Sequence, residues 1–290
     1  MSLKLLLTDA SNAIGSAIEH ELEREAFNLF VPKPGEVDWY KPASVTQYVR
    51  LLRPDVVINC AGWEDIPSAI QQAQLTLVAQ QIAAACAPNN IPLIHLSSYK
   101  VFGGDNKSIH SEKDVPEPNS DAGLAFLTAE QAIEQQLTKW IALRLSWVVG
   151  SYGENHLSRL LRELVEKQHM TVSSRLRGAP TALSDAARVA VAMAKQITCG
   201  AENWGVMHYC TSDACSEAEF AEQVLQVLKQ QQVLPESAEL NVVDQLPENE
   251  PVSAVLSARR VRDYFGIQAR TWRPSLIPMI KQWLHSHVDA

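Results

Sequence analysis

The sequence predicts an α/β protein built on a doubly wound parallel sheet, mainly because of the alternation in its first half. Short apolar runs typical of strands alternate there with segments of helical periodicity. The run 54–62, PDVVINCAG, is apolar almost throughout, which is typical of a strand buried on both faces of a parallel sheet. Repeated strand–helix–strand units place ligand sites at the carboxyl ends of the strands.

Each element of the first half has local support. Ile14, Ile18 and Leu22 fall on one face of a helix predicted over 14–25, with charged residues on the other side. A proline and a serine mark the start of a helix over 43–52. Two further helices are predicted, over 69–88 and from within 118–132, and strands over 3–8, 27–31, 54–62, 91–98 and 140–150.

The pattern after Gly150 is more mixed. The segment 230–253 is rich in proline, glutamine and glutamate, which predicts a loop with a short strand. We expect a strand over 206–210 and helices over 156–168, 216–230, 257–267 and 274–287. The chain is therefore divided into a sheet domain, residues 1–150, and a smaller C-terminal domain, residues 151–290, interleaved in one compact unit.

Composition excludes several classes of protein. The net charge of −8 argues against nucleic acid or an anionic membrane as a partner. The N-terminal apolar run is too short for a signal peptide, and no apolar stretch is long enough to span a membrane, so we expect a cytoplasmic protein. The cysteines form no CxxC pair and the histidines no HExxH pair, so no metal site is predicted.

Several segments together resemble one family, the extended short-chain dehydrogenases/reductases, and within it the dTDP-4-dehydrorhamnose reductases. The segments are LLLTDASNAIGSAI, LRPDVVINCAG, IPLIHLSSYKVFGG, SEKDVPEPN, LRLSWVVGSYGEN, GAPTALSD and LSARRVRDYFGI. The resemblance implies a Rossmann-type, NAD(P)-binding domain over 1–150 and a substrate-type domain over 151–290. It also implies that NADPH or NADH is the cofactor.

The cofactor loop departs from the family pattern of three glycines. Asp9 and Asn12 stand at the first two positions, and only Gly15 remains. A carboxylate about 4 Å from a phosphate costs on the order of 4 kcal/mol, so NADP or NAD binding is expected to be weak or absent. Alternatively, Asp9 points away or caps the helix. The resemblance assigns the cofactor site to Asp9, Asn12, Ala13, Ile14, Gly15, Lys33, Asp38, Ala61 and Gly62. Within this set, Lys33 either meets the adenosine 2′-phosphate of NADP or is a solvated loop lysine.

The catalytic positions also depart from the family. Ser98 matches the serine or threonine that orients the substrate carbonyl. The proton-donating tyrosine and the lysine four residues later fall on Ala122 and Phe126, because Pro118, Gly123 and Glu130 fix the alignment. No YxxxK occurs between Ser98 and Trp140. Alanine donates no proton and phenylalanine carries no charge, so the usual acid catalysis is not expected.

The substrate side shows a charge reversal. Glu250 stands where the family has an arginine that clamps the diphosphate of a nucleotide sugar. Arg259, Arg260 and Arg262 follow closely and either substitute for it or form a solvated helix face. Trp147 and Asn155 complete the residues that the resemblance assigns to the substrate site.

Two hypotheses follow. In the first, the protein is a non-catalytic or strongly impaired member that binds a nucleotide, a nucleotide sugar, a protein partner or a second copy of itself. The regulatory subunit of methionine adenosyltransferase, which has the same fold, is a precedent. In the second, it is an active reductase of dTDP-4-dehydrorhamnose or another nucleotide sugar, with Tyr99 or Lys100 replacing the lost groups.

Overall fold

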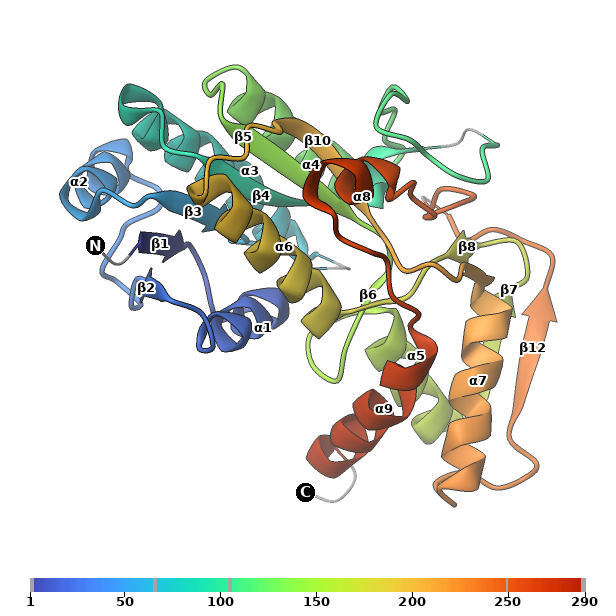
Figure 1. Ribbon diagram of the computed structural model, residues 1–290. Coiled ribbons are helices and arrows are strands. Elements are labelled where there is room, and N and C mark those ends of the chain that lie inside the picture. Colours follow the sequence, from blue (N-terminus) through green and yellow to red (C-terminus); the bar gives the residue numbers. More distant parts are fainter. Residues whose placement is uncertain (1–2, 65–66, 104–105, 249, 288–290) are drawn as a thin grey trace.

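A six-stranded parallel sheet forms the centre of the computed structural model, which describes residues 3–64, 67–103, 106–248 and 250–287 (Figure 1). Every neighbouring pair of its strands is parallel, as the sequence predicts. The strand order is β10 (Gly205–Tyr209), β5 (Trp140–Leu145), β4 (Leu93–Ser98), β3 (Val56–Asn59), β1 (Leu3–Leu7) and β2 (Phe27–Phe30).

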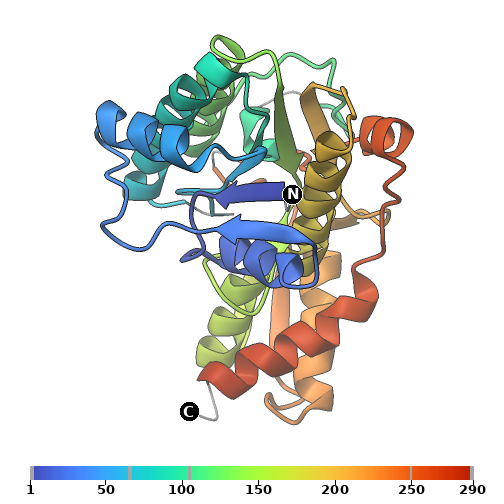
Figure 2. The same cartoon turned by 60° about the vertical axis from the view of Figure 1, so that its left-hand side comes forward.

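Helices cover both faces of this sheet (Figure 2). One layer contains α2 (Pro42–Leu52), α3 (Ala69–Cys86) and α4 (Asp121–Glu134), and the other contains α1 (Ala13–Leu22) and α6 (Leu183–Thr198). Both α6 and β10 come from the second half of the chain, so the two halves interleave in one sheet. The sequence prediction missed α6, although its buried residues, such as Ala186, Ala190 and Met193, recur at helical spacing.

A second lobe lies beyond the carboxyl edge of the sheet (Figure 1). Two small sheets, β7 with β12 and β8 with β11, pack with α5 and α7, and α9 lies against α7. Its elements are α5 (His156–Lys167), β7 (His169–Ser173), β8 (Arg177–Gly178), β11 (Cys215–Ser216), α7 (Glu217–Gln230), β12 (Glu239–Val243) and α9 (Arg273–His287). Helix α8 (Arg259–Phe265) contacts β10 instead, on the first lobe.

The strand predicted over 140–150 is divided in two. Strand β5 ends at Leu145, and β6 (Val148–Val149) pairs with β9 (Thr181–Ala182) instead of continuing the main sheet. At the break, Ser146 Oγ accepts a hydrogen bond from the Ala179 amide at 3.1 Å, and the Thr181 amide donates to the Trp147 carbonyl at 2.7 Å. The strand predicted over 54–62 is shorter as well, since β3 ends at Asn59.

A buried ion pair ties α4 to the sheet. Glu130 on α4 accepts hydrogen bonds from the Arg144 guanidinium at 2.9 and 2.6 Å, and Ser97 Oγ donates to the same carboxylate at 2.5 Å. Glu130 and Arg144 are both buried. Removing either partner would leave an uncompensated charge in the core, so this contact fixes the position of α4 along β4 and β5.

Buried histidines make the fold sensitive to acid. Burial lowers the pKa of His95 to about 4 and that of His208 to about 3. The unfolded chain binds these protons near pH 6.5, whereas the folded chain does not, so stability is complete above that pH and falls as the pH drops toward 4. Each histidine should remove up to about 1.4 kcal/mol per pH unit in this window.

Urea unfolding between pH 7 and pH 4.5 measures this slope. The variant His95→Gln should have a shallower pH dependence than the parent protein, whatever its absolute stability. An identical slope in both proteins would contradict the burial of a neutral His95.

Candidate functional site

The candidate site lies at the carboxyl ends of β1, β3 and β4, where the loop after β1 turns its own side chains inward. Asp9 Oδ1 accepts hydrogen bonds from the amide and the hydroxyl of Ser11, both at 2.7 Å, and Asp9 Oδ2 accepts one from Asn12 Nδ2 at 3.1 Å. Asp9 therefore neither points away nor caps the helix. Its carboxylate instead accepts the Ser11 amide just before the start of α1.

Asn12 is the cap of α1. Its Oδ1 accepts the Gly15 amide at 2.8 Å, and its Nδ2 donates to the Cys60 carbonyl at 2.7 Å. Gly15 allows the helix to approach the loop closely, because a Cβ added there would lie 2.0 Å from the Asp9 carbonyl oxygen. The loop thus keeps its packing glycine, while two of its side chains bind the amides at the start of the helix.

Two adjoining cavities follow this loop. The larger, about 570 Å³, is bordered by Asp9, Lys33 and Trp39 among others, and the smaller, about 180 Å³, by Asp9 and Glu64. Among the described residues that line them, Lys33 is the only lysine or arginine. The side chains that line the cavities thus carry more negative than positive charge.

The other residues assigned to the cofactor site do not all lie along the two cavities. Asp38 forms an ion pair with Lys41 at 2.9 Å and does not border either cavity. Ala61 is buried, and Gly62 has a φ of +71° and borders the smaller cavity. Ala13 and Ile14 belong to the first turn of α1.

The end of β4 carries the serine expected there. Ser98 is 1% exposed, and its Oγ accepts the Lys100 amide at 3.3 Å. Helix α4 passes close to this turn, since a Cβ added to Gly123 would lie 2.1 Å from the Lys100 carbonyl oxygen. Ala122 is half-buried and Phe126 is 0% exposed, so the aromatic ring lies in the hydrophobic core.

Trp63 is a site residue that sequence reasoning missed. It follows β3, is 3% exposed, and donates from Nε1 to the Ser97 carbonyl at 3.2 Å. Its indole therefore crosses from the end of β3 to β4, close to Ser98. The only sequence signal was a large aromatic residue directly after the AG of a buried strand.

A polar cluster, formed by Tyr99, Lys100, His156 and Glu250, lies beside Ser98. Lys100 Nζ is 2.5 Å from Glu250 Oε1, and the Tyr99 hydroxyl donates to Glu250 Oε2 at 3.1 Å and lies 3.5 Å from His156 Nε2. Burial, with Arg159 and Lys100 nearby, holds the pKa of His156 well below its usual value, so its imidazole is neutral. Glu250 thus forms an ion pair with Lys100 inside this polar cluster.

The remaining assigned residues lie around this cluster or outside it. The Trp147 ring is 4.7 Å from that of His156, and Asn155 Oδ1 caps α5 by accepting the Leu157 and Ser158 amides. Arg259 pairs with Asp263 on exposed α8, as does Arg262, and Arg260 donates to the Val206 and Trp204 carbonyls. These contacts place none of the three arginines with Glu250.

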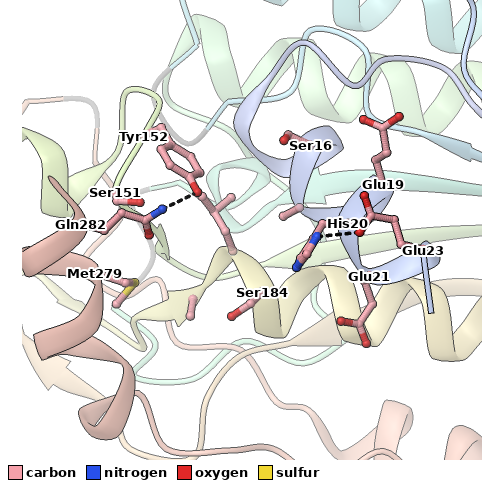
Figure 3. A pocket seen from close by; sticks show the side chains of 14 residues that line it. Ser16, Glu19, His20, Glu21, Glu23, Ser151, Tyr152, Ser184, Met279 and Gln282 are labelled. Carbon is pink, nitrogen blue, oxygen red and sulfur yellow. Dashed lines mark hydrogen bonds and ion pairs between the residues drawn. The ribbon is translucent and has the colours of Figure 1, made fainter. Parts of the chain in front are cut away.

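A third cavity, of about 460 Å³, lies elsewhere, between α1, the start of α6 and α9. Figure 3 shows Tyr152 and Gln282 joined by a hydrogen bond on one side of it, and His20 paired with Glu23 on the other. None of the residues that the sequence assigned to the cofactor or catalytic sites borders it. It is therefore separate from the site at the carboxyl ends of the strands.

The comparisons with known proteins agree with this architecture. The family model described as RmlD substrate binding domain matches residues 3–285. The chain belongs to the RmlD family. A dTDP-4-dehydrorhamnose reductase of Burkholderia thailandensis is 27% identical to this RmlD-family chain over 290 residues, with 93% of this chain and 96% of the relative covered.

Solved structures of RmlD-like proteins share the fold. A crystal structure of a dTDP-4-dehydrorhamnose reductase from Clostridium acetobutylicum has a TM-score of 0.84 at 22% identity, over 96% of this chain and 99% of the other. The structure of the Bacillus anthracis reductase in complex with NADP has a TM-score of 0.81 at 21% identity, over 97% and 99%.

Two further features of this RmlD-family chain concern its described residues. No helix among them is both long and apolar enough to cross a membrane. No group of three or more histidine, cysteine, aspartate or glutamate side chains in the described ranges is arranged to hold a metal ion.

Removing the Asp9 carboxylate should improve dinucleotide binding. The variant Asp9→Gly frees the Ser11 amide and removes a negative charge beside the diphosphate, so NADPH should bind at least about tenfold more tightly than to the parent, a change of about 1.4 kcal/mol. Fluorescence titration measures the dissociation constants. Asp38→Asn is the matched control, because it removes a carboxylate outside the cavities. Equal affinities for Asp9→Gly and the parent would show that Asp9 is not the obstacle.

The Lys100–Glu250 ion pair should show strong coupling in a double-mutant cycle. Lys100→Met and Glu250→Gln should each destabilise the protein by about 3 kcal/mol, because each leaves one charge in a largely buried site. The double variant should recover most of this loss. The exposed pair Arg162–Glu154 is the control, and breaking it should cost less than about 1 kcal/mol. If the stability loss of the double variant equals the sum of the two single losses, the two side chains do not interact as proposed.

Proposed function

We propose that this dTDP-4-dehydrorhamnose-reductase-like protein is a non-catalytic member of its family with a binding or regulatory role. The observation that carries the proposal is the replacement of the family's tyrosine and lysine by Ala122 and fully buried Phe126. Neither side chain donates a proton or holds a ribose. Positioned acid catalysis contributes about 10²–10⁴-fold in rate, and that contribution is lost.

The cofactor loop supports the same proposal. A diphosphate binds at a helix N-terminus through free backbone amides and favourable charge. Here the Ser11 and Gly15 amides donate to Asp9 and Asn12 of the same loop. Asp9 and Glu64 add negative charge along the cavities. We therefore propose that NADP and NAD bind weakly or not at all, although homologous structures contain them.

The site next to Ser98 is occupied by side chains of the protein itself. Trp63, Tyr99 and Trp147 are all buried there. The protein keeps the shape of a sugar-nucleotide enzyme without the groups for hydride transfer. A binding role, toward a nucleotide, a nucleotide sugar, a partner protein or a second copy of the chain, is what this arrangement supports.

A second candidate function rests on Tyr99. Its hydroxyl lies in the polar cluster, Lys100 is adjacent in sequence, and the Tyr99 ring is 5.0 Å from Lys100 Nζ, so Tyr99 could act as a relocated acid. Against this role, the hydroxyl already donates to Glu250. If the protein does reduce a nucleotide sugar, Tyr99→Phe should abolish that activity.

A reductase assay tests the proposal directly. With dTDP-4-dehydrorhamnose and either NADPH or NADH, we expect no turnover above background, and no dinucleotide binding at micromolar concentration by tryptophan fluorescence. A dTDP-4-dehydrorhamnose reductase from a relative, assayed in parallel, provides the positive control. Turnover comparable to that enzyme would overturn the proposal, and its loss in Tyr99→Phe would then support the second candidate.

A further inference from the structure

We propose that Tyr99, Lys100 and His156 form a binding site for a ligand carboxylate, and that Glu250 occupies this site in the absence of the ligand. The inference relies on the proposed function only in assuming that the cleft does not serve hydride transfer. It adds the chemical class of the ligand and the way in which the ligand replaces the Glu250 side chain. The polar cluster described above carries it.

The contacts of Glu250 are those of a bound carboxylate. Each of its two oxygens has its own partner: Oε1 the Lys100 ammonium at 2.5 Å, and Oε2 the Tyr99 hydroxyl at 3.1 Å. The two donors come from the turn after β4, whereas Glu250 is 150 residues further along the chain. One cation and one neutral donor, each directed at one oxygen, satisfy the hydrogen-bonding needs of a carboxylate.

The groups that hold the carboxylate are more deeply buried than the carboxylate itself. Tyr99 is 0% exposed, and the side chains of Lys100 and Glu250 are 7% and 20% exposed. Glu250 is therefore the most exposed member of the group. An incoming ligand can replace it from that side while the binding groups stay in place.

A buried donor without a partner in the described part of the chain lies on a residue that contacts the cluster. Trp147 is fully buried, and its Nε1 has no hydrogen-bond partner among the described residues. Its ring lies 4.7 Å from that of His156. Because a buried donor without an acceptor is costly, an acceptor on a bound molecule would stabilise this position.

The charge of the site favours a carboxylate over a phosphate. Lys100 is the one cation that contacts Glu250 among the described residues, and His156 is neutral. A monoanion balances this charge, whereas a phosphate dianion would leave excess negative charge in a buried site. A small organic acid or a sugar acid therefore fits the site better than a phosphate ester does.

Replacement of the Glu250 side chain by a ligand requires little movement of the backbone. The chain after Glu250 is held by hydrogen bonds between Arg177 and both Val252 and Ala254, and Ser253 Oγ donates to the Ser108 carbonyl. These bonds begin two residues beyond Glu250. Rotation of the Glu250 side chain toward solvent can therefore open the site while the segment stays attached.

Chemical rescue tests the site. In Glu250→Ala, sodium acetate should raise the thermal unfolding midpoint by roughly 2–4 °C more than sodium chloride at equal concentration, because acetate fills the vacated position and binds only the folded state. The acetate concentration for half of this effect should be at least tenfold lower than in the parent protein, where Glu250 competes. Glu250→Ser, which keeps a polar group, is measured in the same way.

The controls separate the possible outcomes. Glu248→Ala removes an exposed carboxylate nearby and should respond to acetate no more strongly than the parent protein, and Lys100→Met combined with Glu250→Ala should lose the acetate effect. Folding of Glu250→Ala only in acetate would support the proposal. Equal effects of acetate and chloride in both Glu250 variants, persistent unfolding of both variants in acetate, or rescue by inorganic phosphate alone would overturn it. None of these results depends on dinucleotide binding or reductase activity, so the proposed function can fail separately.

Discussion

The buried ion pair between Glu130 and Arg144 is the contact on which the geometry of the cleft depends. It joins α4 to β5, and through Ser97 to β4, so the helix cannot slide along the sheet without separating charges in the core. Gly123 adds a steric constraint, because α4 passes against the Lys100 carbonyl. Positions 122 and 126 are therefore held beside Ser98 in a fixed register. The alignment that assigns Ala122 and Phe126 to the family's tyrosine and lysine relies on residues of this same helix.

The second constraint is the ion pair between Lys100 and Glu250, two residues that are distant in the sequence. A glutamate in place of the family's arginine would by itself leave an unpaired carboxylate in the cleft, and Lys100 would by itself be an unpaired buried cation. Together they form a contact of 2.5 Å. Such a pair contributes less to net stability than to specificity, because desolvation offsets much of its attraction. Its main structural effect is to connect the segment around Glu250 to the end of β4.

The sequence predicted the parts of this protein that depend on local pattern. The apolar run 54–62 indicated a parallel sheet, and Pro118, Gly123 and Glu130 located Ala122 and Phe126 on α4. It did not predict the contacts made across the fold. Glu250 meets Lys100 over 150 residues, and Asn12 donates to the carbonyl of Cys60, which follows another strand. Helix α6 was missed although its buried residues recur at helical spacing.

The complete burial of Phe126 also constrains how the protein can evolve. A codon for phenylalanine becomes one for lysine only when every base changes, and most intermediates place an unsuitable side chain in a filled core. A lysine at this site would need space that neighbouring residues now occupy, and a partner for its charge. Introducing a lysine at position 126 would thus require compensating changes in the surrounding core. The packing of one aromatic ring therefore makes this position resistant to replacement by a charged residue.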